Sequence, residues 1–202
     1  MSWYDDLWRD APDPLPGYDV QRRRAFLFEH VRAGRRVLDL GCGEGDFGAA
    51  AAEAGADVLG VDVAEEAIRR ARARHPELRF EHIDDTLPTD DATIDLVWCS
   101  EVLEHVLDTA RILSEARRVL RTGGVLAATT PGHGPLCRLR LAVAGWERHF
   151  DPRGADLRFY TARSLRELLD DFGFDDVRVR AGGGHLFAAA RRAGIAAYDP
   201  RP

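Results

Sequence analysis

The 202-residue chain contains no lysine, so all 28 of its basic residues are arginine. Its 34 acidic residues outnumber them, and the formal net charge is -6 at pH 7. A net negative charge argues against a polyanion as the main partner, because phosphate recognition needs a basic surface. We therefore expect a small-molecule partner and no nucleic acid.

The sequence also shows no paired cysteines, no long apolar run and no signal-peptide pattern in its first thirty residues. Cys42, Cys99 and Cys137 are odd in number and far apart, which predicts neither a disulfide framework nor a zinc site. No apolar run approaches the roughly 20 residues that a membrane-spanning helix needs. Residues 1–30 have neither the basic start nor the apolar core of a signal peptide. These absences predict a soluble cytoplasmic protein without a membrane partner, and they leave its oligomeric state unknown.

What is present suits one globular domain preceded by a short N-terminal region. Hydrophobic residues make up 45% of the chain and charged residues 31%, which is ordinary for a soluble domain. Residues 1–34 combine an aromatic segment, three prolines and a helical pattern over residues 21–31. We expect the aromatic segment either to fold over the site as a lid or to cover apolar core surface. Residues 35–202 form the main domain.

Residues 36–45 are the stretch around which the chain is organised. A short apolar run at residues 37–40 suits a buried strand, and Gly41, Gly43 and Gly45 let the backbone turn and lie against a ligand. The alanine-rich residues 46–54 follow as a helix. This order of strand, glycine loop and helix is typical of a nucleotide-like cofactor site.

An acid distinguishes this loop from a dinucleotide site. Gly43, Gly45 and Gly48 do fit the dinucleotide pattern G-x-G-x-x-G. Asp39, however, would repel a pyrophosphate, whereas it would attract an ammonium group. The sequence Val-Leu-Asp-Leu-Gly-Cys-Gly-Glu-Gly at residues 37–45 resembles the first motif of the class I methyltransferases that depend on S-adenosylmethionine (SAM).

The order of the expected elements agrees with this resemblance. Five strand patterns alternate with helical ones and are followed by two strands around Gly182, Gly183 and Gly184. The resemblance implies an α/β fold with a doubly wound, mostly parallel seven-stranded, Rossmann-like sheet, a C-terminal antiparallel hairpin and helices on both faces. One helix is expected to run from residue 101 to about residue 121. An insertion at about residues 131–160 is expected to build the acceptor pocket.

A second acid ends the next strand, about twenty residues after the glycines. Asp62 is placed where a carboxylate accepts both ribose hydroxyls of the cofactor. The family has a further acid against the adenine, and this role is carried to Asp84, with Asp85 as the alternative. One of Arg22, Arg23 and Arg24 either binds the SAM carboxylate, as an arginine does in similar enzymes, or joins a solvated face. The expected cofactor-binding residues are Asp39, Gly41, Cys42, Gly43, Asp62, Val63, Asp84, Asp85, Ser100 and Glu101.

Methyl transfer to a hydroxyl group also requires that the hydroxyl lose its proton, to a side chain or with the help of a metal. Glu101, Glu104 and His105 are expected on one face of a helix because of their spacing. The sequence Glu-Val-Leu-Glu-His-Val at residues 101–106 resembles one found in ubiquinone-biosynthesis and small-RNA 2′-O-methyltransferases. His105 and His149 are the candidate catalytic residues, with His133 a further candidate base.

Two interpretations of this cluster stay open. In one, Glu101 lines the cofactor pocket while Glu104 and His105 make structural hydrogen bonds. In the other, Glu101, Glu104, His105 and Asp156 hold Mg²⁺ or Mn²⁺, as the matching residues do in the small-RNA enzymes, although those relatives have histidine at the position of Asp156.

The sequence thus predicts a SAM-dependent methyltransferase that acts on a small molecule, at a hydroxyl oxygen. Two alternatives remain. A nicotinamide-dependent oxidoreductase is favoured by the literal glycine pattern, and a noncatalytic SAM-binding module would bind the cofactor without turnover.

Overall fold

The computed structural model of the protein describes residues 3–13, 19–84, 86–134, 137, 139, 143 and 156–194. His149 and Asp85, both named above as candidate site residues, lie outside this set, as does most of the expected insertion.

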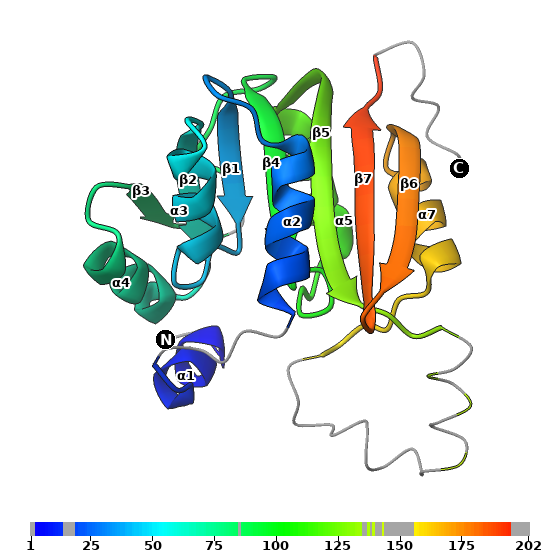
Figure 1. Ribbon diagram of the computed structural model, residues 1–202, viewed down its shortest axis with the longest axis horizontal. Coiled ribbons are helices and arrows are strands. Elements are labelled where there is room, and N and C mark those ends of the chain that lie inside the picture. The colour runs from blue at the N-terminus through cyan, green and yellow to red at the C-terminus, as the bar shows by residue number, and fades with distance from the viewer. Residues whose placement is uncertain are drawn as a thin grey trace.

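Seven strands form one sheet in the order β3-β2-β1-β4-β5-β7-β6 (Figure 1). Strands β1 to β5 run parallel to one another, whereas β7 is antiparallel to both β5 and β6. The expected sheet and its C-terminal hairpin are therefore confirmed. The strand bounds are β1 (Arg36–Leu40), β2 (Asp57–Asp62), β3 (Arg79–His82), β4 (Ile94–Ser100), β5 (Leu120–Pro131), β6 (Phe174–Gly182) and β7 (His185–Arg192).

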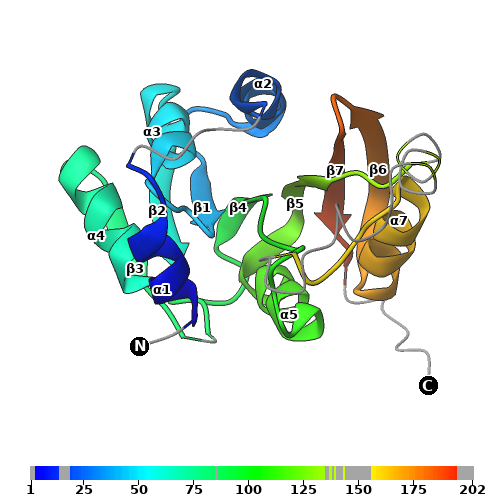
Figure 2. The same ribbon diagram turned by 90° about the horizontal axis from the view of Figure 1, so that it is seen from below.

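Helices cover both faces of the sheet (Figure 2). One face carries α2 (Val20–His30), α3 (Asp46–Glu53) and α4 (Glu65–Arg74), and the other carries α5 (Thr109–Val119) and α7 (Ala162–Asp171). The alternation of side chains along β1 explains this, because Val37 packs in the α2–α3 cluster while Leu38 and Leu40 pack in the α5–α7 cluster. Each such leucine contributes about 1.5–3 kcal/mol by burial.

Trp98 in β4 fixes the position of α2 and α3 on the sheet. Its ring lies 5.9 Å from that of Phe26 in α2 and 5.5 Å from that of Phe47 in α3. Trp98 is fully buried, and aromatic groups of this size dominate core energetics. The packing holds the start of α3 next to the carboxyl end of β1.

The helix expected from residue 101 begins only at Thr109, so the first part of that prediction is wrong. Residues 101–108 form turns, and α5 is capped by Asp108, whose side chain accepts a hydrogen bond from the Arg111 amide at 2.9 Å. Glu101 has a φ of 55°, which is left-handed and incompatible with a right-handed helix. Helical spacing therefore does not bring Glu101, Glu104 and His105 together.

A helix that the sequence analysis did not predict opens the described chain. It is α1 (Trp3–Asp10), and it lies across the carboxyl ends of β1 and β2 beside α4 (Figures 1 and 2). The aromatic N-terminal segment is therefore ordered against the edge of the sheet where the glycine loop lies.

Candidate functional site

The glycine loop follows β1 and turns sharply under the neighbouring strand. The amides of Gly41 and Cys42 both donate to the carbonyl oxygen of Val61 in β2 at 2.9 Å. Gly41 has a φ of 70°, and a Cβ there would lie 2.3 Å from a methyl group of Val102. Only glycine fits, so the loop packs directly against the turns that follow β4.

Asp39 is buried at the carboxyl end of β1, with 3% of its surface exposed. Within the described residues its Oδ2 has no hydrogen-bond partner. Burial raises the pKa of Asp39 to about 7, against the opposing effect of the Gly48 amide, and the charge of Asp62 adds to the rise. A carboxylate in this position calls for a cation, which the ammonium group of a bound amino acid would supply.

Asp62 lies at the carboxyl end of β2 and holds the glycine loop. Its two oxygens accept hydrogen bonds from the amides of Gly43 at 3.0 Å and Ala64 at 2.9 Å. Burial raises its pKa, and these amides counteract the rise. Because a carboxylate offers about four acceptor positions, Asp62 keeps acceptor capacity for a hydroxyl of a ligand.

The other cofactor candidates surround this pair of acids. Cys42 is buried and burial raises the pKa of its thiol, so its role in the loop is packing rather than nucleophilic attack. The carbonyl oxygen of Val63 lies 3.1 Å from Nε2 of His82. Asp84 is exposed just beyond β3, and its expected contact with adenine stays a prediction.

A hydrogen-bond network joins the ends of β4, β5 and α2. Oγ of Ser100 lies 2.7 Å from Oγ1 of Thr129, and Arg23 donates to Ser100 at 3.2 Å. Oγ1 of Thr129 in turn donates to Glu101 at 2.8 Å. Arg23 is buried, and its guanidinium lies 5.0 Å from the ring centre of Phe47. Arg23 therefore faces the site rather than a solvated surface.

His185 is a residue of this network that the sequence analysis missed. Its Nε2 lies 3.3 Å from Oε2 of Glu101, and only 3% of the residue is exposed. Burial acts to raise the pKa of Glu101, but the hydrogen bonds from His185 and Thr129, together with the charges of His185 and Arg23, lower it overall. The hydrogen bond to Glu101 raises the pKa of His185. The only signal in the sequence was a histidine directly after three glycines, where the β6–β7 hairpin turns towards the site.

Glu104 and His105 form a second group with Asp156. Nδ1 of His105 lies 3.3 Å from Oδ1 of Asp156, and Nε2 lies 3.9 Å from Oε1 of Glu104. Glu104 is fully buried, and burial, reinforced by the charge of Glu101, raises its pKa to about 8. The carbonyl oxygen of Glu104 accepts hydrogen bonds from the amides of Leu157 and Arg158, which fixes residues 156–158 beside it.

The arrangement does not support the expected metal site. In the part of the chain that the structure describes, no group of three or more His, Cys, Asp or Glu side chains is placed to hold a metal ion. Glu101 pairs with His185 instead of joining Glu104 and His105. The ring of His133 lies 5.0 Å from that of Phe159, and its amide donates to the carbonyl oxygen of Tyr160 at 2.8 Å.

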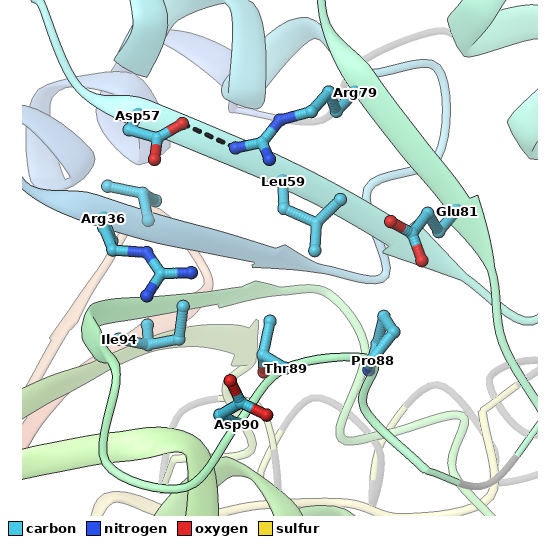
Figure 3. A pocket seen from close by; sticks show the side chains of 10 residues that line it. Arg36, Asp57, Leu59, Arg79, Glu81, Pro88, Thr89, Asp90 and Ile94 are labelled. Atoms are coloured by element: carbon cyan, nitrogen blue, oxygen red, sulfur yellow. Dashed lines mark hydrogen bonds and ion pairs between the residues drawn. The ribbon is translucent and has the colours of Figure 1, made fainter.

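A separate hollow of about 170 Å³ lies at the amino ends of the strands, opposite the glycine loop. Its lining includes Arg36, Asp57 and Arg79, which are the first residues of β1, β2 and β3. Arg79 and Asp57 lie 2.6 Å apart, and Figure 3 shows this ion pair. Its walls carry charges of both signs, and none of the expected site residues belongs to it. The glycine loop and the two acids face the other end of the strands.

Comparison with known proteins agrees with this geometry. Residues 8–179 match the family model described as "Methyltransferase domain". The chain is 36% identical over 180 residues to a protein of Mycolicibacterium smegmatis named "Probable S-adenosylmethionine-dependent methyltransferase", covering 86% of this chain and 67% of that protein. It is 36% identical over 155 residues to the ubiquinone biosynthesis O-methyltransferase of Psychrobacter arcticus, covering 70% of this chain and 60% of the relative.

Solved structures agree on the fold. A SAM-dependent methyltransferase from Mesorhizobium loti superposes with a TM-score of 0.67 at 24% identity, covering 88% of this chain and 99% of that one. Phosphoethanolamine N-methyltransferase 2 of Haemonchus contortus, solved with SAM, gives a TM-score of 0.66 at 18% identity, over 86% of this chain and 53% of that one. No described helix is long and apolar enough to cross a membrane. The family match, the glycine loop and the two buried acids lead to one conclusion: this chain belongs to the SAM-dependent methyltransferases.

Proposed function

We propose that the protein transfers a methyl group from SAM to a hydroxyl oxygen of a small-molecule acceptor. The observation that carries the cofactor part is the buried carboxylate of Asp39, whose Oδ2 has no partner in the described chain, next to a loop held by Asp62. A methionine ammonium would pair with Asp39, and a ribose diol would use the acceptor positions left on Asp62. When bound, SAM supplies a methyl group activated by its sulfonium.

The other residues are assigned around these two contacts. Gly41, Cys42 and Gly43 would lie along the cofactor, Val63 and Asp84 near the adenosine, and Ser100 and Glu101 at the methyl-transfer end. Arg23 is proposed to bind the methionine carboxylate, because its guanidinium is buried beside Ser100 and in the field of Glu101. The aromatic segment at the start of residues 1–34 would provide the lid, and the insertion at about residues 131–160 would form the acceptor pocket.

His105 is proposed as the group that takes the proton from the acceptor hydroxyl. It lies 3.3 Å from the carboxylate of Asp156, which would stabilise the imidazolium that forms, and 3.9 Å from the buried carboxyl group of Glu104. The rest of the catalysis would consist of alignment and exclusion of water. The name of the Psychrobacter relative, an O-methyltransferase of ubiquinone biosynthesis, supports oxygen as the methylated atom.

The test is a turnover assay with SAM and a panel of phenols, catechols and aliphatic alcohols, read by mass spectrometry for methyl ethers and S-adenosylhomocysteine (SAH). Methyl ethers formed by the wild-type protein and lost in His105→Gln would support the proposal. Products methylated only at nitrogen or carbon would overturn the assignment to oxygen. SAH binding without product from any acceptor would favour the noncatalytic module, and parallel reactions with Mn²⁺ or a chelator test the metal alternative.

A further inference from the structure

Helix α1 contacts the glycine loop, helix α4 and the turns at residues 101–108 at the same time. The hydroxyl of Tyr4 donates to the carbonyl oxygen of His105 at 2.8 Å. Oδ1 of Asp5 accepts a hydrogen bond from the amide of Glu65 at the start of α4, also at 2.8 Å. A Cβ on Gly43 would lie 3.0 Å from the ring of Trp8, so this indole rests directly on the glycine loop.

A single buried arginine binds the end of α1 to α4. Arg70 is 8% exposed, and its guanidinium donates to the carbonyl oxygens of Trp8 at 2.8 Å, Ala11 at 3.1 Å and Pro12 at 3.2 Å. The Trp8 carbonyl belongs to the last turn of α1, where no further amide of the helix is available to it, and Ala11 and Pro12 follow the helix directly. A cation at this end also interacts favourably with the helix dipole.

The same arginine reaches the glycine loop through Glu44. Nη1 of Arg70 lies 3.5 Å from Oε1 of Glu44, and Arg74 binds the second oxygen of Glu44 at 2.5 Å. Glu44 lies within the loop between Gly43 and Gly45 and is 6% exposed. The buried guanidinium of Arg70 therefore connects the glycine loop to α1.

The acid assigned to the ribose lies beneath this helix. Asp62 is 7% exposed. Burial raises the pKa of the Tyr4 hydroxyl, and the negative charge of Asp62 raises it further, to a smaller extent. Because Trp8 rests on Gly43 and Tyr4 lies in the field of Asp62, α1 would have to move away from the loop before a ligand could bridge Asp39 and Asp62. The contact of Trp8 with Gly43 would then re-form beside the bound ligand.

We propose that α1 is a wall of the cofactor site, with Trp8 contacting the bound cofactor, and that Arg70 is the positioning residue that holds this wall closed. The proposal rests on the assignment of the cofactor site above. It makes release of SAH depend on the breaking of the Arg70 contacts. Through Tyr4 and the His105 carbonyl, it also ties the closed position of α1 to the turns on the acceptor side.

The experiment compares Arg70→Gln with Arg69→Gln in the full-length chain. Arg69 is the preceding residue of α4 and shares Glu66 as a partner, but its side chain is 66% exposed and its hydrogen bonds go to Glu66 within the same helix. SAH affinity is measured by calorimetry, SAH release by stopped-flow tryptophan fluorescence, and opening of α1 by amide hydrogen exchange. We expect Arg70→Gln to release SAH at least tenfold faster and to exchange the α1 amides faster, whereas Arg69→Gln stays within twofold of wild type.

Trp8→Ala keeps the proposal testable if Arg70→Gln does not fold. Leu7→Ala is its control, since Leu7 is exposed on the same helix. Trp8→Ala should accelerate SAH release in the same way, with an unfolding midpoint close to that of Leu7→Ala. Folded Arg70→Gln and Trp8→Ala proteins that both release SAH at the wild-type rate would overturn the proposal. Wild-type protein that does not bind SAH would instead overturn the cofactor assignment.

Arg70→Lys separates the two parts of the contact. Lysine keeps the charge near Glu44 but offers one point of attachment in place of a planar fork that reaches three carbonyls. We expect its SAH release rate to stay close to that of Arg70→Gln. A rate restored to the wild-type value would show that charge alone holds α1 and would overturn the bridging role.

Discussion

Nε2 of His185 at the start of β7 lies 3.3 Å from Oε2 of Glu101 at the end of β4. The contact crosses β5, because β5 lies between these two strands in the sheet. Glu101 holds a left-handed backbone conformation there, with its other carboxylate oxygen bound by Thr129. The C-terminal hairpin thus positions Glu101, the first residue of the turns at residues 101–108.

This pair should be strongly coupled in the free energy of unfolding. Removal of one member of a fully buried ion pair costs about 3–5 kcal/mol, and because 21% of the Glu101 side chain is exposed, we expect a smaller cost here. We expect His185→Gln and Glu101→Gln each to destabilise the protein, and the double variant to be less unstable than the sum of the two. Urea unfolding at pH 7 measures all four proteins of the cycle.

The control for this cycle is the exposed pair of Arg163 and Glu167 on α7. Their side chains lie 2.7 Å apart but are 87% and 57% exposed. Solvent screening limits such a pair to a few tenths of a kcal/mol, so its cycle should show almost no coupling. Equal coupling in the two cycles would contradict the structural importance of the buried pair.

Asp39→Asn should weaken cofactor binding and raise the free energy of unfolding above neutral pH. The pKa of Asp39 is raised to about 7 in the fold, above its value of 3.8 in the unfolded chain. A group with a raised pKa favours folding at low pH, and this contribution is lost as the pH rises through 7. The variant should therefore be more stable than wild type at pH 8, by about 1–3 kcal/mol, and should gain nothing at pH 3.

The same variant should lose SAH binding, since it lacks the charge that would pair with the ammonium. Asp57→Asn is the matched control, because Asp57 is an exposed residue at the opposite end of the neighbouring strand. Calorimetry should show wild-type affinity for Asp57→Asn and none for Asp39→Asn at micromolar concentrations. Retained binding in Asp39→Asn would remove Asp39 from the cofactor site.

The affinity of the wild-type protein for SAH should fall as the pH is lowered. Below pH 7 Asp39 becomes protonated, and binding of an ammonium group must first release that proton. With a pKa of about 7, the dissociation constant should rise by about 25-fold between pH 7.5 and pH 5.5. Methylthioadenosine, which lacks the amino-acid part, is the comparison ligand and should show no such dependence on Asp39.

Gly41→Ala should damage the loop far more than the same change elsewhere. Gly41 and Gly123 have nearly equal φ angles, 70° and 74°, but a Cβ at Gly41 meets Val102 at 2.3 Å whereas one at Gly123 meets nothing within 4 Å. Gly123→Ala should cost about 1–2 kcal/mol for the left-handed backbone alone. Gly41→Ala should cost more in urea unfolding and should also abolish SAH binding, because the clash displaces the loop.

The sheet could be predicted because its strands are local patterns. Residues 37–40 and 57–62 each combine a short apolar run with a terminal acid, and these patterns survive in the fold as β1 and β2. The turns after β4 could not be predicted in this way. The spacing of Glu101, Glu104 and His105 suits a helix, but the left-handed Glu101 and the cap at Asp108 move the helix start to Thr109.

The contacts of α1 were beyond local patterns for a related reason. Arg70 looks like any arginine on a solvated helix face until the fold places the carbonyls of Trp8 and Ala11 next to it. The aromatic N-terminal segment indicated either a lid over the site or a cover for apolar core surface, without naming its contacts. Its three attachment points come from residues about forty to a hundred positions away.

By itself, the sequence determined the order of strands and helices, the glycine loop and the two acids at the ends of β1 and β2, because each depends on neighbours within a few residues. Only the tertiary structure decided that Glu101 pairs with His185, that Arg23 is buried and that Arg70 joins α1 to the loop. Those pairings depend on which distant side chains the sheet brings to the same edge, and on how much water it leaves around them.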